Sequence, residues 1–326
     1  MIWPMILFLC KLALEFANKM NKLRGFLDLL KGPLKIISQN GKLIAITATV
    51  YLILYSISFI LYTSSANPFI VDLVLKLFAL VSAHPGTPEY TKLLVAIRED
   101  IGIFLGIETV YAVFCFFVLI FVQTTIITIA SSYYNGNNLS LRELIIKVSS
   151  TWTRPFVTSI YVQLLSLGYI CFFFLPFLIP SLILFDHPII LTTVLIFLAI
   201  LFITFNLYLS VVWILAVVVS VFEDTYGLSA LGNARELVKG KRLNGFLLNC
   251  LFILVILVIF MVGSKLSPAM PIIVGLIQVV LIGLVSIFQF MAYSVFYNQC
   301  KNNTKISGRL EYRQIPTAAV LDENLP

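Results

Sequence analysis

Six long apolar runs dominate this sequence, and each is long enough to cross a membrane as a helix. A helix needs about 20 apolar residues to span a hydrocarbon core of about 30 Å. Of the 326 residues, 60% are apolar and 11% are charged, against about 45–50% and about 25% in soluble domains. The sequence therefore predicts an all-α, polytopic transmembrane helical bundle. The six runs cover residues 43–62, 101–129, 156–184, 189–222, 246–263 and 271–297.

These runs divide the chain into three regions. Residues 1–42 precede the first run, and the apolar stretch at 2–9 is too short to span alone. We interpret residues 1–24 as an amphipathic helix at the membrane interface, with a seventh span as the alternative. Residues 43–300 form the six-span domain. Residues 301–326 are polar and are predicted to be a disordered cytoplasmic tail.

The basic residues predict the orientation of the spans. All but four of the 22 lysines and arginines fall on the side of the two termini. The positive-inside rule then places both termini in the cytoplasm, in the endoplasmic reticulum or the plasma membrane. The formal charge of +7 is accounted for by this orientation, and we predict no nucleic-acid partner. The four exceptions are Lys76, Lys92, Arg98 and Lys265.

Short amphipathic segments precede three of the spans on the predicted cytoplasmic side. They begin near Phe26, Leu141 and Leu228, and the second opens with a capping box of Ser140 and Glu143. In the third, Leu228 is predicted on the apolar face. Such segments are typical of helices that lie in the interface. The sequence therefore suggests a three-fold parallel repeat of interfacial helix and helical hairpin.

Few polar residues lie inside the runs. Glu108 is the one ionisable residue well within a span, and such a residue is a functional candidate by default. The alternative is a structural contact, in which Glu108 reaches the interface or pairs with Arg98. Intramembrane amides either hydrogen-bond neighbouring helices or line a polar conduit. The amide candidates are Gln163, Asn206, Gln278 and Gln289, and Gln123 and Asn249 are of the same kind.

The spans contain no histidine and no aspartate. Both histidines, His84 and His187, fall in predicted outer loops. The ligand sets of intramembrane metalloenzymes and the aspartates of intramembrane proteases are therefore not found in the spans. The five cysteines form no metal-binding spacing. We predict no catalytic residue, no metal and no cofactor.

Charges gather directly after the fourth run. Glu223 and Asp224 end it, and four bases follow within twenty residues. The acids would either clamp a short helix to the span or balance a lipid phosphate beside the bases. Basic groups at the interface attract anionic headgroups by about 1 kcal/mol each. The four bases are Arg235, Lys239, Lys241 and Arg242.

The stretch from Trp213 to Gly245 reads WILAVVVSVFEDTYGLSALGNARELVKGKRLNG. With Trp152, it resembles a motif of plant six-span membrane proteins that are distantly similar to the bacterial membrane domain accompanying some glycerophosphodiester phosphodiesterases. The resemblance implies a fold, and it carries no phosphodiesterase activity because this sequence has no soluble phosphodiesterase domain. The shared residues are Ser220 to Glu223, Gly227, Ala230, Leu231, Lys239 and Gly240.

Three functions are compatible with these features. The first is a non-enzymatic membrane protein that contacts lipids, anionic headgroups above all, and organises protein partners. The second is a transporter of small solutes or lipids that uses Glu108 and the amides. The third is an intramembrane enzyme that modifies lipid with Glu108 or Glu223. We favour the first, because the chemistry needed for the third is not found in the spans.

Overall fold

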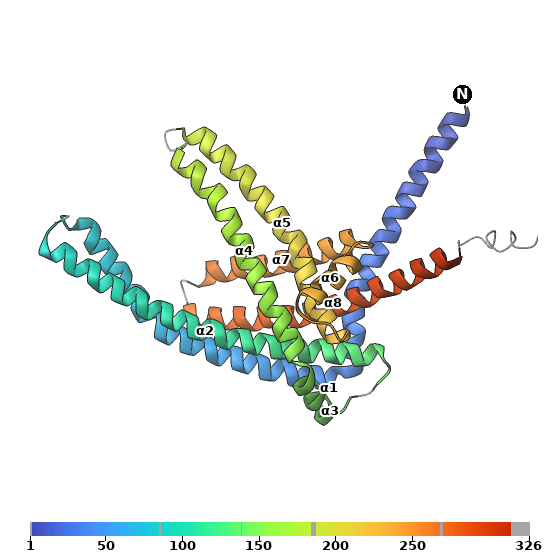
Figure 1. The fold of residues 1–326 in the computed structure, drawn as a ribbon, viewed down its shortest axis with the longest axis horizontal. Helices are drawn as coiled ribbons and strands as arrows, with labels where there is room; N and C mark the ends of the chain where they lie inside the picture. The colour runs from blue at the N-terminus through green and yellow to red at the C-terminus, as the bar shows by residue number, and fades with distance from the viewer. Residues whose placement is uncertain (1, 85, 138, 184–186, 268–269, 314–326) are drawn as a thin grey trace, which may run out of the picture. The chain divides into compact units, whose positions relative to one another are not determined.

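Eight helices make up the described part of the chain. The computed structural model describes the backbone of residues 2–84, 86–137, 139–183, 187–267 and 270–313, and the side chains of residues 28–303 within these ranges. The helices are α1 (Ile2–Ser82), α2 (Pro88–Tyr134), α3 (Leu141–Thr151), α4 (Thr153–Ile183), α5 (Pro188–Phe222), α6 (Gly227–Val238), α7 (Arg242–Leu266) and α8 (Pro271–Arg313) (Figure 1).

Six of these helices are long and apolar enough to cross a membrane, and this confirms the predicted number of spans. They are α1, α2, α4, α5, α7 and α8, and each contains one predicted run. The largest difference lies in α1 and α2. Residues 63–100 lie between the first two predicted runs, and most of them are helical, because α1 continues to Ser82 and α2 begins at Pro88.

The chain divides into two compact units, and four helices contribute to both. The first unit comprises Met1–Gly41, Ile126–Leu254 and Phe288–Pro326. It holds most of the large, fully buried side chains, among them Leu215 of α5, Leu248 of α7 and Tyr293 of α8. Here α4 and α5 form an antiparallel hairpin (Figure 1). Tyr169 of α4 stacks on Phe202 of α5 and donates a 2.5 Å hydrogen bond to its carbonyl oxygen.

The second unit comprises Lys42–Thr125 and Val255–Ile287. Its helices approach closely at glycines of α7 and α8. A Cβ atom at Gly275 would lie 2.4 Å from the ring of Phe59, and one at Gly263 would lie 2.0 Å from the amide of Gln278. Small residues at such positions let helix backbones pack tightly inside a membrane. By contrast, Gly102 and Gly106 have nothing within 4 Å of an added Cβ.

At both ends of the chain, the first and last helices continue beyond the predicted spans. α1 begins at Ile2, and its one non-helical residue is Asn40, where two helices meet at a kink. The side chains of residues 1–27 lie outside the described residues, so the interfacial helix at 1–24 stays a prediction. α8 continues to Arg313. Residues 314–326 lie outside the described part, and the disorder predicted for residues 301–326 also stays a prediction.

Two of the three amphipathic segments form separate helices, α3 and α6. The capping box of α3 is confirmed: the Glu143 amide donates to Ser140 Oγ, and Glu143 Oε2 accepts from the Ser140 amide. These hydrogen bonds lower the pKa of Glu143. The segment at Phe26 instead belongs to the continuous α1. The three-fold repeat and the interfacial position of these segments stay predictions.

Candidate functional site

The candidate site begins where the apolar helix α5 ends. Glu223 follows Phe222 in an extended conformation, with φ of −118°. Four residues later, Gly227 has a φ of +62°, which favours glycine, and α6 begins there. The Gly227 amide donates a 2.9 Å hydrogen bond to Oγ1 of the buried Thr158 of α4. The turn that presents Glu223 is therefore fixed by α4.

Glu223 joins three helices of the first unit. Its carboxylate accepts hydrogen bonds from Tyr297 Oη at 2.7 Å, from Lys301 Nζ at 3.1 Å and from Asn233 Nδ2 at 3.3 Å. Lys301 also donates to Tyr297 Oη at 2.8 Å. Burial raises the pKa of Glu223, but the hydrogen bonds from Tyr297 and Lys301 outweigh it, so the pKa lies below its ordinary value of 4.5. Glu223 is thus an ionised clamp between α5, α6 and α8.

The neighbouring acid makes a different contact. Asp224 forms an ion pair with Arg154, at the start of α4. The Asp224 side chain is 90% exposed. A pair so open to solvent adds little to stability. The two adjacent acids therefore differ: Glu223 is enclosed by three partners, whereas Asp224 lies at the surface.

The four predicted bases do not pair with these two acids. Lys239 forms its ion pair with Glu236, at 2.6 Å, and Lys241 donates to the neutral Gln299 at 3.5 Å. Arg235 and Arg242 are exposed, and within residues 28–303 no ion pair joins either to an acid. The predicted clamp exists, but Lys301 and Arg154 provide its positive charges.

The exposed side of α6 also differs from the prediction. Ala230, Ala234 and Val238 form its buried face. Leu228, expected on the apolar face, is 62% exposed. Residues seven and eleven positions apart share one side of a helix, so Leu228 lies in one exposed stripe with Arg235 and Lys239.

Glu108 lies in the second unit and has a tyrosine as its partner. Tyr62 of α1 donates a hydrogen bond to Glu108 Oε1, and the ring of Tyr62 stacks on Tyr111, with centroids 4.5 Å apart. The alternative ion pair with Arg98 is not formed, and Arg98 is exposed. A hollow of about 590 Å³ beside these tyrosines is lined mainly by apolar side chains of α1 and α2.

The intramembrane amides fall into two groups. Gln278 donates to the Ile259 carbonyl at 3.4 Å, and Asn249 donates to the Leu207 carbonyl at 3.1 Å. The predicted interhelical hydrogen bonds are therefore confirmed at these two positions. Gln163 is exposed, whereas Asn206 and Gln289 are half-buried.

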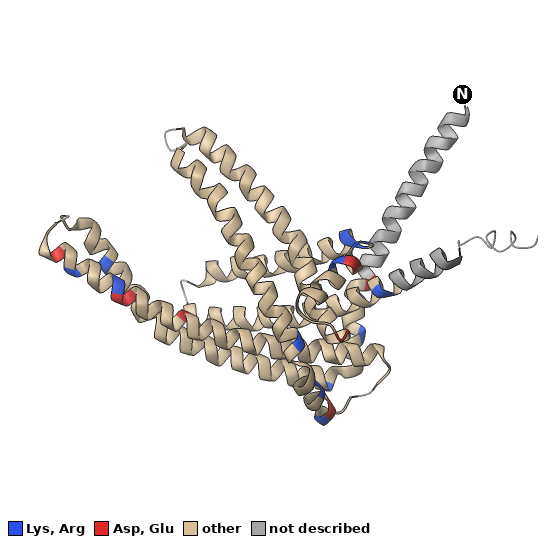
Figure 2. Ribbon diagram, in the orientation of Figure 1, with Lys and Arg blue, Asp and Glu red and all other residues tan. Residues whose placement is uncertain are grey.

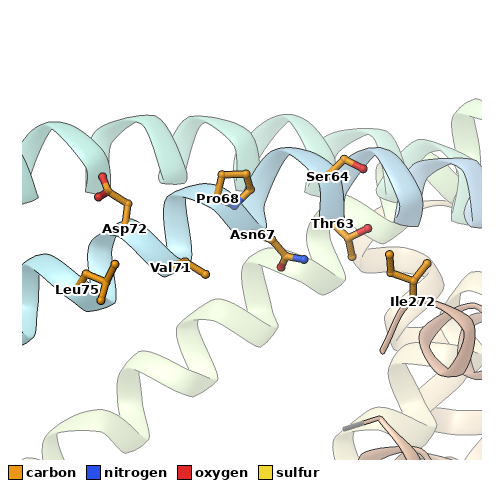
Figure 3. Close-up of a pocket in the computed structure, with 8 residues that line it drawn as sticks. All are labelled: Thr63, Ser64, Asn67, Pro68, Val71, Asp72, Leu75 and Ile272. Carbon is orange, nitrogen blue, oxygen red and sulfur yellow. The ribbon is translucent and has the colours of Figure 1, made fainter. Parts of the chain in front are cut away.

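A second hollow, of about 480 Å³, lies where α1 leaves the predicted first span. Its lining includes the polar side chains of Thr63, Ser64 and Asn67, directly before Pro68 (Figure 3). Asp72 lies one turn further along the helix, and Ile272 of α8 closes one side. Within the described residues, no group of three or more His, Cys, Asp or Glu side chains is placed to hold a metal ion.

Residues 16–307 match the family described as a domain of unknown function, DUF8558. The chain belongs to this family. No curated protein and no solved structure matches it. The DUF8558 description names no organism and no activity, so the resemblance to plant six-span proteins stays a prediction.

Sequence reasoning missed most of the partners of Glu223 in this DUF8558 chain. Lys301 and Tyr297 are four residues apart on α8, a spacing that places them on one face. That local signal was available, but nothing nearby in sequence connects them with Glu223, 74 residues before Tyr297. Thr158 gave no signal, because its hydroxyl acts on a backbone amide 69 residues away.

Proposed function

We propose that this DUF8558 chain is a non-enzymatic multi-pass membrane protein that binds anionic lipid headgroups on the face that carries α6, and there organises lipids and protein partners. Both termini lie in the cytoplasm in this proposal, in the endoplasmic reticulum or the plasma membrane. The proposal rests mainly on one observation. The bases around α6 are not neutralised by Glu223 and Asp224, because those acids pair with Lys301 and Arg154.

The balance of charge supports an anionic ligand. Of the four bases on and after α6, only Lys239 forms an ion pair within the described residues. Its partner Glu236 also lies in the field of Arg235 and Arg242, and it is one acid among four bases. Exposed ion pairs such as this one are weak and readily exchanged for another anion. Lys241 contacts an amide, so its charge remains available. The cluster therefore keeps an excess of positive charge toward solvent or headgroups.

The side chains beside the bases support a membrane surface as the source of that anion. Tyr226 is 59% exposed and Leu228 is 62% exposed. Tyrosine is typical of the headgroup level, where its ring and hydroxyl meet apolar and polar surroundings. Leu228 shares its stripe with Arg235 and Lys239, the arrangement by which an interfacial helix inserts an apolar residue among phosphates.

The test is native mass spectrometry of the full chain, extracted with its lipids. A variant with Arg235, Lys239, Lys241 and Arg242 all changed to glutamine should lose the anionic lipid that the natural protein retains. Four contacts of about 1 kcal/mol each are an upper limit, so the affinity should fall by at least tenfold and by at most about a thousandfold.

A matched control removes exposed bases elsewhere. Lys92, Arg98 and Lys265 are exposed and belong to the predicted opposite side. Changing these three to glutamine should leave anionic lipid binding within a factor of two. Equal loss in both variants would indicate a nonspecific effect of net charge and would overturn the proposal. Unchanged binding in the first variant would overturn it as well.

One observation favours the transporter as a second candidate. Tyr62, the partner of Glu108, also lines the hollow of about 590 Å³ between α1 and α2. A transport pathway at this place requires water access to the carboxylate. Cysteine at position 108 should then react with charged thiol reagents from the aqueous phase in intact vesicles. No reaction, with normal labelling after solubilisation, would exclude this pathway.

A further inference from the structure

The hairpin of α1 and α2 is far longer than a membrane crossing needs. The part of α1 whose side chains are described, Asp28–Ser82, has 55 residues, and α2 has 47. At 1.5 Å per residue these are about 80 and 70 Å long. A crossing tilted by 40° uses only about 39 Å of helix. Residues 69–82 of α1 and 88–100 of α2 therefore lie beyond the first two spans, and we call them the distal hairpin.

The charges nearest the helix contact of the distal hairpin form one cluster, in which Lys76 pairs with two acids. Lys76 of α1 lies 2.6 Å from Asp100 of α2 and 2.7 Å from Asp72. The Asp100 side chain is only 14% exposed, and that of Lys76 is 26% exposed. The pair of Lys76 and Asp100 therefore holds the two helices together, whereas Asp72, on the same helix as Lys76, is 53% exposed.

The outward side of α1 in the distal hairpin is apolar. Phe78 is 72% exposed and Val81 is 87% exposed. With Val71 and Leu75 they recur every three or four residues, which places them on one side of the helix. Ile70, Val74 and Leu77 widen this strip and are all exposed. Monomers in water rarely expose apolar strips of this size.

The outward side of α2 carries charged residues beside the apolar Leu94 and Val95, which are 43% and 57% exposed. Lys92, Arg98 and Glu99 are all exposed, and within residues 28–303 none of them forms an ion pair. Figure 2 shows both basic and acidic residues on the distal part of the hairpin. The distal hairpin thus has one apolar edge, from α1, and one mixed edge, from α2, on which its exposed charges lie. That distribution is typical of a segment that lies in a membrane surface.

The segment of α1 between the first span and the distal hairpin supports this position in the membrane surface. Thr63, Ser64 and Asn67 form a polar stretch after the apolar residues of the first span, and Pro68 follows within the helix (Figure 3). Proline inside a helix removes a backbone hydrogen bond and favours a bend. The polar stretch fits the headgroup level, and a bend at Pro68 would turn the following helix toward the membrane plane.

We propose that the distal hairpin lies along the bilayer surface on the side where α1 leaves the membrane. Its apolar edge of Val71, Leu75, Phe78 and Val81 enters the acyl chains. Its mixed edge of α2 faces water. This surface is separate from the basic residues at α6, and the proposal does not depend on the function proposed above.

The test uses spin labels on the full chain in phosphatidylcholine vesicles. Single cysteines are placed at Phe78, at Glu99 and, as a lipid-facing reference, at Leu61, which is 63% exposed in the first span. The five natural cysteines are replaced by serine or alanine. Labels at 78 and 61 should collide more often with oxygen, which dissolves in lipid, than with a water-soluble nickel chelate. The label at 99 should show the reverse preference by at least threefold.

Two outcomes would overturn the proposal. A nickel-accessible label at 78 would place the apolar edge in water, and a label at 78 shielded from both reagents would show that protein covers it. A second measurement requires no substitution. Natural protein in vesicles with a carbene-generating phospholipid should be labelled within residues 70–81 and not within 88–100. Labelling of both segments, or of neither, would also refute the proposal.

Discussion

Replacing Glu223 with glutamine should lower the free energy of unfolding by about 1–2 kcal/mol at pH 7. Glutamine keeps the shape and one acceptor oxygen but removes the charge. A hydrogen bond to a charged group contributes about 1.5–3 kcal/mol, and a neutral one about 0.5–1.5 kcal/mol, so each bond loses about 1 kcal/mol. The bond from Tyr297 counts fully because Tyr297 is buried. The bond from Lys301 counts less, because that side chain is 38% exposed.

The assay is equilibrium unfolding of the full chain in lipid nanodiscs, measured from pH 7 to pH 3. The pKa of Glu223 is lowered in the folded protein. Its contribution is therefore complete above the pKa of the unfolded chain and is lost as the pH falls through the lower folded value. The difference between the natural protein and the Glu223→Gln variant should stay constant down to about pH 5 and shrink below about pH 4.5.

Asp224→Asn is the matched control, because it removes the same charge one residue away from a side chain that is 90% exposed. It should leave the free energy of unfolding nearly unchanged. The reasoning is refuted if this variant costs as much as Glu223→Gln, or if Glu223→Gln has no effect at pH 7. A double-mutant cycle with Tyr297→Phe should give a coupling energy of about 1 kcal/mol if the two side chains act as one cluster.

Three further predictions concern the framework of the first unit and use the same unfolding assay. Gly245→Ala should lower the free energy of unfolding by about 1–3 kcal/mol. The added methyl would lie 2.8 Å from a valine of α5 and 3.0 Å from a phenylalanine of α8. Gly240→Ala is the control, because an added methyl there has no atom within 4 Å. Thr158→Val should cost about 1–3 kcal/mol, because the buried amide of Gly227 loses its acceptor, and an unchanged stability would show that water replaces the hydroxyl. Ser140→Ala should cost about 1 kcal/mol and speed hydrogen exchange in the first turn of α3, and no change in exchange would contradict the role of the capping box.

The number of spans could be predicted because an apolar run is visible in neighbouring residues of the sequence. The lengths of α1 and α2 could not be predicted, because they depend on contacts between distant residues. Asp72, Lys76 and Asp100 interrupt the apolar pattern after the first span, and scattered charges are typical of a solvated connection. In the folded chain Lys76 lies between the two acids. One of these acids is 24 residues away, so no local pattern reveals that the charges are paired and that the helices continue.

The contacts of the candidate site could not be predicted for the same reason, since their partners are even further apart in sequence. The acids at 223 and 224 and the bases after α6 were found because charges at the end of an apolar run are conspicuous. The sequence left open whether the acids clamp a short helix or balance a lipid phosphate beside the bases, and it identified no distant partner for either acid. Helix ends from α4 and α8 bring Arg154 and Lys301 to the acids. Leu228 was misplaced although the periodicity of α6 was sufficient, because it lies seven and eleven residues before Arg235 and Lys239 and so shares their side of the helix.

The contacts of Glu223 have a consequence for biogenesis. Lys301 lies 78 residues further along the chain, so the ribosome needs about 4 to 16 seconds to synthesise it after Glu223. During that interval the carboxylate has neither Tyr297 nor Lys301, and α5 has already become available for insertion. Because Glu223 lies at the end of α5, its carboxylate can stay in contact with water until α8 has been synthesised. Nascent chains truncated before the last helix should therefore still insert their first spans, although Glu223 lacks its partners Tyr297 and Lys301.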